Sequence, residues 1–172
     1  PIQIHATLEV IEALENHIFN WTIYPRFSEL ENVNGKVMCY RPFQVLEKVQ
    51  IQDLTFQTIE VNHKVPTVGM IVSDEKSKIA ITSDTAKMDK FWELINGQEK
   101  LDALLIECAF PNELSELAQS SHHLTPKGLE KELAKFTQTD CPIYVVNIKP
   151  MYREKIISEL KNLNNPHLNI FQ

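Results

Sequence analysis

Residues 79–85 read Ile79-Ala80-Ile81-Thr82-Ser83-Asp84-Thr85, a short β-branched run that ends in polar residues. The run predicts a strand whose end carries the carboxylate of Asp84 just before a helix. In α/β proteins, loops at such sheet edges hold ligands and carry chemistry. Asp also serves as a turn or cap residue at strand ends, so this run alone does not decide between a structural and a functional role.

Polar residues at other predicted strand ends favour the functional interpretation. A site that hydrolyses phosphoesters with two metal ions needs His and Asp ligands from several strand ends. One carboxylate must also bridge ions about 3.5–4 Å apart. Asp84 is placed for that bridge, and His63 precedes the predicted hairpin that leads to Asp84. The alternative for a lone histidine is a structural, hydrogen-bonded role.

Two further residues form a predicted proton-transfer pair. His123 lies in the loop 122–126, before a predicted helix, where it suits a proton donor to a leaving oxygen. Glu107 lies on a predicted buried strand and needs a partner if it is ionised. We expect it to orient His123, although a buried Glu that caps a loop is the alternative. A later strand end should add a metal ligand, and it carries Asn147, a neutral and poor donor for zinc.

The rest of the chain alternates between β-forming and helix-forming segments. We expect strands over residues 2–5, two or three strands within 37–61, a hairpin of 65–73 and 78–83, and strands over 101–109, 142–148 and 168–171. Helices are expected over 7–20, 88–94, 113–119, 126–136 and 151–162. This order predicts an α/β protein with a mixed sheet flanked by helices.

Composition limits the classes of partner. The 172 residues suffice for one domain over residues 1–172, and the hydrophobic content of 43% is ordinary for a globular protein. The net charge of −6 argues against nucleic acid or an anionic membrane surface as the main partner. An odd number of widely spaced cysteines (Cys39, Cys108 and Cys141) predicts reduced thiols. No apolar run is long enough to span a membrane.

Several motifs have a familiar order. Residues 107–114 read ECAFPNEL, residues 121–126 read SHHLTP, residues 147–150 read NIKP, and residues 83–85 read SDT. Together with HIFN at residues 17–20, they resemble the class II cyclic-nucleotide phosphodiesterases, which are metal-dependent enzymes with the metallo-β-lactamase fold. The resemblance extends over nearly the whole chain. A similar order of ligands occurs in the tRNA 3′-processing endonucleases of the same fold.

The resemblance implies an αββα sandwich with two zinc ions in the complete site. It places metal ligands at His63 and at the bridging Asp84, and the acid-side histidine at His123 with Glu107 behind it. Two departures stand out. The last metal histidine of the family is here Asn147, and the family's H-x-H-x-D-H loop does not occur in this sequence. We therefore expect a chain that is incomplete at its N-terminus, equivalent to the C-terminal two-thirds of such an enzyme, and that binds zinc weakly or not at all.

The expected function is hydrolysis of cyclic AMP or a related small cyclic nucleotide by a metal-bound hydroxide. One alternative is a non-catalytic relative, a binding or structural domain that has lost the metal centre. Another is a different phosphodiesterase or a nuclease of the same fold. We expect no nucleic-acid or membrane partner, and a homodimer stays open. The cytoplasm is the expected compartment, with the periplasm as the alternative if a preceding segment carries a signal.

Overall fold

The computed structural model describes residues 1–170, and the chain divides into two units, Pro1–Glu47 and Lys48 onward. The expectation of one domain over residues 1–172 stays a prediction. Residue 171, which belongs to the expected last strand, lies outside the described residues.

The first unit holds one helix and two pairs of strands. These are α1 (Leu8–His17), the parallel pair β1 (Ile2–Ala6) and β4 (Met38–Pro42), and the antiparallel pair β2 (Glu31–Asn32) and β3 (Gly35–Lys36).

The expected helix over residues 7–20 stops three residues early, at His17. Asn20 explains the difference, because its side-chain oxygen accepts hydrogen bonds from the amides of Thr22 and Ile23. Such side-chain contacts offer the backbone an alternative to helical pairing.

The second unit is built on a seven-stranded sheet in the order β11-β10-β9-β8-β7-β6-β5. Its strands are β5 (Lys48–Ile51), β6 (Leu54–Glu60), β7 (Val68–Ser73), β8 (Lys78–Ile81), β9 (Ala103–Glu107), β10 (Ile143–Val146) and β11 (Leu168–Ile170). Neighbours from β5 to β8 are antiparallel, and neighbours from β8 to β11 are parallel. The mixed sheet expected from the sequence is confirmed.

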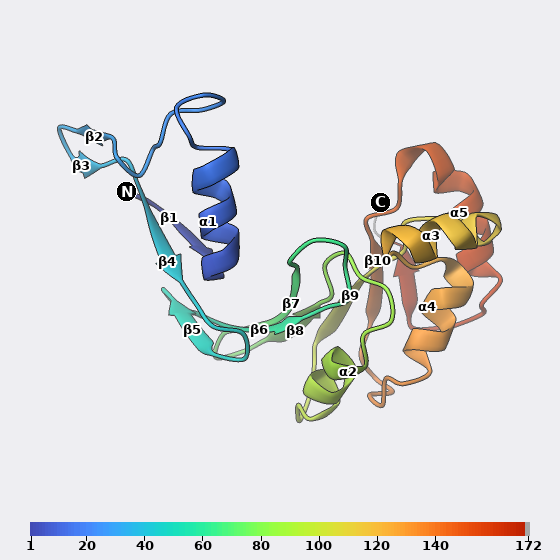
Figure 1. Cartoon of the computed structure of the whole chain (residues 1–172). Helices are drawn as coiled ribbons and strands as arrows, with labels where there is room; N and C mark the ends of the chain where they lie inside the picture. The colour runs from blue at the N-terminus through green and yellow to red at the C-terminus, as the bar shows by residue number, and fades with distance from the viewer. Residues whose placement is uncertain (171–172) are drawn as a thin grey trace. The chain divides into compact units, whose positions relative to one another are not determined.

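Helices and short 3-10 turns connect the later strands (Figure 1). They are α2 (Asp89–Asn96), η1 (Asn112–Leu114), α3 (Ser115–Ser121), α4 (Pro126–Leu133), η2 (Pro150–Tyr152) and α5 (Arg153–Lys161). Thr125 caps α4, since its hydroxyl accepts a hydrogen bond from the amide of Gly128. The helix ends at Leu133, three residues before the expected end.

The core of this unit joins the sheet to its helices. Fully buried side chains come from α2 (Phe91 and Ile95), from β9 (Leu104 and Ile106) and from α5 (Ile156). Strand β9 has parallel neighbours on both sides, which explains its nearly continuous apolar sequence.

The expected hairpin is present, but both of its strands are shorter than predicted. β7 begins at Val68 and not at Val65, because Pro66 has no amide hydrogen to pair. β8 ends at Ile81, since Ser83 adopts a left-handed φ of 57° that breaks the extended chain.

The topology brings four strand ends to one edge of the sheet. β6 and β8 are each antiparallel to β7, so they run in the same direction, and β9 and β10 are parallel to β8. The C-terminal ends of all four strands therefore lie at the same edge, which is where open α/β sheets bind ligands.

No helix within residues 1–170 is both long enough and apolar enough to cross a membrane.

The packing of β7 against α2 leads to a testable prediction about Gly69. A Cβ atom at this position would lie 2.8 Å from Phe91 Cε2 and 3.0 Å from Val61 Cγ1. Because the Phe91 ring is fully buried and cannot move aside, we expect Gly69→Ala to lower the free energy of unfolding by about 1–3 kcal/mol.

Urea unfolding of both proteins measures this effect. Gly128→Ala is the matched control, because a Cβ there meets its neighbours at 3.5 Å and the residue lies in a helix. It should be neutral or stabilising. Equal stability of Gly69→Ala and the parent protein would contradict the tight packing of β7 on α2.

Candidate metal centre

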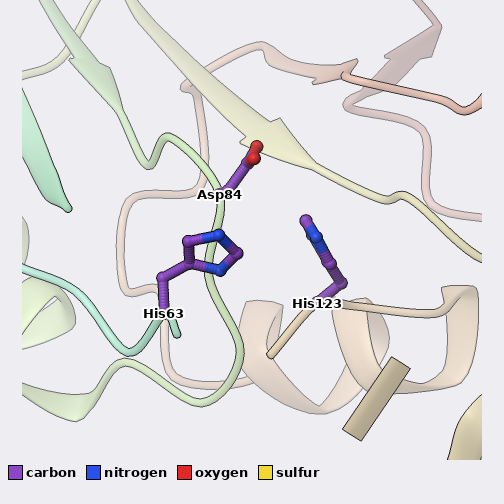
Figure 2. Close-up of side chains that lie close together, drawn as sticks. All are labelled: His63, Asp84 and His123. Carbon is purple, nitrogen blue, oxygen red and sulfur yellow. The ribbon is translucent and has the colours of Figure 1, made fainter. Parts of the chain in front are cut away.

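Three side chains gather at the shared sheet edge. His63, Asp84 and His123 each offer one ligand atom, and these atoms all lie within 4.8 Å of one another (Figure 2). His63 follows β6, Asp84 follows β8, and His123 comes from the loop between α3 and α4. The structure thus brings together the residues that the sequence assigned to one site, while their roles stay predictions.

Each histidine has one ring nitrogen fixed by an acceptor. His63 Nδ1 lies 3.1 Å from the backbone oxygen of His122, and His123 Nδ1 lies 3.0 Å from Glu107 Oε1. Because a carbonyl or carboxylate oxygen only accepts, each Nδ1 carries the hydrogen. The Nε2 atom of each neutral ring is therefore left with a free lone pair, which is how metal-binding histidines are usually fixed.

The carboxylate of Asp84 is anchored in a similar way. Asn147 Nδ2 donates a hydrogen bond of 2.6 Å to Asp84 Oδ1, whereas Oδ2 accepts none from residues 1–170. Asn147 thus reaches the site, as the sequence predicts for the residue at the end of β10. It contacts the carboxylate through its amide nitrogen, which is a donor group and not a metal ligand.

Glu107 lies behind His123 and is completely buried. Its Oε1 accepts hydrogen bonds from His123 Nδ1 and from the amides of Leu124 and Thr85, at 3.0, 3.1 and 3.2 Å. The partner that the sequence predicted for this carboxylate is present. Burial raises the pKa of Glu107, and the hydrogen bonds and charge of His123 oppose that shift without cancelling it.

Left-handed backbone conformations surround the cluster. Ser83, His122 and Asn147 have φ values of 57°, 57° and 54°, and each immediately precedes a cluster residue or contacts one. Such conformations cost free energy in non-glycine residues and persist only where the surrounding structure enforces them. They aim Asp84 and His123 toward the shared space.

Two features of the site were missed by the sequence analysis. His122 Nδ1 lies 2.7 Å from Asn62 Oδ1, which ties the loop before α4 to the loop after β6. His123, expected only as a proton donor, also lies within ligand distance of His63 and Asp84. For the first feature, the only signal in the sequence was that Asn62 directly precedes His63 and His122 directly precedes His123.

The donor set fits one zinc ion. Two imidazoles and one carboxylate make the three protein ligands typical of a zinc site that keeps an open position. Within residues 1–170 no second cluster of this kind occurs. The structure therefore offers three donors, where the sequence had counted His63 and Asp84 alone.

Comparison with known proteins concerns the sequence and the fold of the chain. No family model matches the chain. The sequence is similar to a probable 3′,5′-cyclic-nucleotide phosphodiesterase of Yersinia pestis, with 26% identity over 193 residues that cover 94% of this chain and 55% of that protein. The chain thus spans about half the length of this curated relative. The resemblance to cyclic-nucleotide phosphodiesterases is confirmed.

Solved structures establish the fold. Unliganded yeast PDE1 matches with a TM-score of 0.80 and 20% identity, over 98% of this chain and 56% of that one. The metallo-β-lactamase fold protein YhfI from Bacillus subtilis matches at 0.70 and 16%, over 99% and 62%. Zn²⁺-bound PqqB from Methylobacterium extorquens matches at 0.69 and 14%, over 100% and 63%. The chain has the metallo-β-lactamase fold, as the sequence predicted.

The three donors lead to a prediction about zinc. We expect the chelator-treated protein to take up one equivalent of Zn²⁺, measured by competition with a fluorescent chelator. His63→Gln should weaken binding by more than about tenfold, since even changes behind the ligands typically cost about 10–100-fold. His167→Gln is the control, because His167 lies outside the cluster. An equal loss in both variants, or no loss in either, would contradict the assigned site.

Asn147 leads to a second prediction. Asn147→His should place an imidazole beside Asp84 and strengthen zinc binding by about tenfold or more. The backbone should tolerate the change, because His and Asn are both enriched in the left-handed region that residue 147 occupies.

Asn147→Gly is the matched control. It keeps the left-handed backbone without strain and removes the amide, so zinc binding should not strengthen. If Asn147→His leaves zinc binding unchanged and lowers the melting temperature, residue 147 has a purely structural role.

Proposed function

We propose that this chain carries the catalytic residues of a metal-dependent phosphodiesterase that hydrolyses cyclic nucleotides such as cyclic AMP. The observation that carries the proposal is the anchoring of His63, Asp84 and His123, each held by one polar atom and open at another. The sequence similarity to a probable cyclic-nucleotide phosphodiesterase supports the choice of substrate class.

Zinc is the ion that we propose for this site, because imidazole and carboxylate together suit a borderline cation. When bound, zinc would supply a Lewis acid for the phosphoryl oxygens and would lower the pKa of a bound water. In the chain as described, its ligands would be His63, Asp84 and His123.

We assign to His123 the protonation of the leaving ribose oxygen. The Glu107 carboxylate fixes its Nδ1–H and stabilises a positive charge on the ring, which leaves Nε2 to deliver a proton. The arrangement resembles the acid–histidine part of a catalytic triad, in which the carboxylate orients the ring. An Nε2 that carries this proton has no lone pair for zinc, so in this role of His123 the ion would be held by His63 and Asp84.

The competing function is a non-catalytic binding or structural domain. Asn147 favours it, because the residue supplies an amide hydrogen to Asp84 in place of the imidazole of the family. Under this alternative the cluster would still bind zinc, and turnover would be absent.

Glu107→Gln provides the test. Glutamine has nearly the same shape and keeps an acceptor for His123, but it removes the negative charge that favours the protonated ring. We expect zinc binding to weaken by up to about 10–100-fold, because Glu107 lies behind His123. At saturating zinc, release of AMP from cyclic AMP should fall by about 10²–10⁴-fold, the range typical of general acid–base catalysis.

Glu130→Gln serves as the control. Glu130 is exposed on α4, and its substitution removes the same negative charge at a position outside the cluster. Turnover should be unaffected in that variant. Absence of zinc-dependent AMP release from the parent chain, or equal turnover in the parent chain and Glu107→Gln, would contradict the proposed role of the pair.

A further inference from the structure

A groove adjoins the candidate metal centre in the second unit. It has a volume of about 560 Å³, and its walls come from the loop after Asp84, from α3 and from α4. His123 lines the groove and also belongs to the metal cluster, so a molecule held at the cluster can extend into the groove. The volume lies within the range of small-molecule sites.

Three lysines line the groove: Lys87, Lys127 and Lys131. Lys127 and Lys131 are exposed and lie one turn apart on α4, where like charges repel each other. Within residues 1–170 the Nζ atoms of these two lysines take part in no ion pair closer than 4.0 Å. Two unpaired ammonium groups side by side are unexpected in a chain of net charge −6.

Two carboxylates, Glu132 and Asp89, are already engaged by other groups. Glu132 also lines the groove, but its oxygens accept hydrogen bonds from Trp92 Nε1 at 2.8 Å and from Lys135 Nζ at 2.6 Å. Asp89 lies 2.9 Å from Lys87 Nζ and 2.7 Å from Lys135 Nζ. The surplus charge of the groove is therefore positive, and it is concentrated on Lys127 and Lys131.

The lysines, and not the first amides of α4, are the groups available to an anion in this groove. The amide of Lys127 donates to Asn112 Oδ1 at 2.9 Å, and the amide of Gly128 donates to the Thr125 hydroxyl at 3.2 Å. Lysine ammonium groups bind phosphate as compact point charges. Apolar side chains such as Ala118 and Leu124 line the groove between the charges and suit a sugar or a base.

We propose that this groove binds a second phosphate group of the substrate. The preferred substrate is then a cyclic nucleotide with two phosphates, as in a cyclic dinucleotide, and a cyclic mononucleotide such as cyclic AMP is the weaker substrate. One phosphodiester lies at the metal cluster, and the other phosphate reaches Lys127 and Lys131 past His123. This inference rests on the proposed function for its substrate class, but binding in the groove itself requires no metal.

Titration of the metal-free protein tests the proposal separately from catalysis. The full chain, kept in a chelator, is titrated with cyclic di-AMP and with cyclic AMP, and binding is followed by calorimetry and by amide chemical shifts. We expect cyclic di-AMP to bind more tightly, with shifts at Lys127 and Lys131, and the difference should shrink as salt screens the charges.

Lys127→Gln/Lys131→Gln should weaken cyclic di-AMP binding by about three- to tenfold, the effect of losing two exposed ion pairs, and should leave cyclic AMP binding unchanged. Lys90→Gln/Lys161→Gln removes the same charge from exposed positions outside the groove and should have no effect.

Three outcomes would overturn the proposal. They are equal affinity for the two nucleotides, no binding of cyclic di-AMP by the parent chain, and an equal loss in both double variants. Because the parent chain alone reports the affinity difference and the shifted residues, the result does not depend on how the variants fold. Failure of hydrolysis by the zinc-loaded protein would leave these outcomes unaffected.

Discussion

The buried carboxylate of Glu107 is the interaction on which the site depends. Its Oε1 accepts hydrogen bonds from Thr85, His123 and Leu124, and so joins β9 to the loop after β8 and to the loop before α4. Removing one partner of a buried charged pair typically costs about 3–5 kcal/mol, because the remaining group is left without compensation. Asp84 directly precedes Thr85, and His123 directly precedes Leu124. Glu107 therefore fixes the positions of Asp84 and His123 relative to each other.

The sheet supplies the other constraint. Parallel alignment of β6 with β8, β9 and β10 brings His63, Asp84 and Asn147 to one edge, although 84 residues separate the first from the last. Hydrogen bonds between loops then hold the side chains, as His63 does with the His122 carbonyl and Asn147 with Asp84. The sheet therefore fixes the distances between the strand ends, and the loops fix the orientation of the side chains at the site.

The sequence predicted the elements of the second unit well, because runs of β-branched residues and helix start and stop residues are local signals that act within a few residues. It also predicted the pairing of Glu107 with His123, since a buried charge requires a partner. It did not predict the left-handed backbone at Ser83 and His122, or that His123 lies within ligand distance of His63. Those features result from contacts between loops that are distant in the sequence, which hydrophobic periodicity does not encode.

Asn147 connects the number of metal ions to the chemistry of the site. Asp84 Oδ1 accepts a hydrogen bond from the Asn147 amide, and each carboxylate oxygen has a second lone pair that can still bind an ion. That bond offsets part of the negative charge of Asp84 without an imidazole at residue 147, and the cluster within residues 1–170 therefore offers three donors and not four. A site with one ion has less charge to offset a developing phosphoryl anion. The lysines of the neighbouring groove, and Lys149 over the Phe110 ring that packs against His123, are then further sources of positive charge for a substrate with a second phosphate.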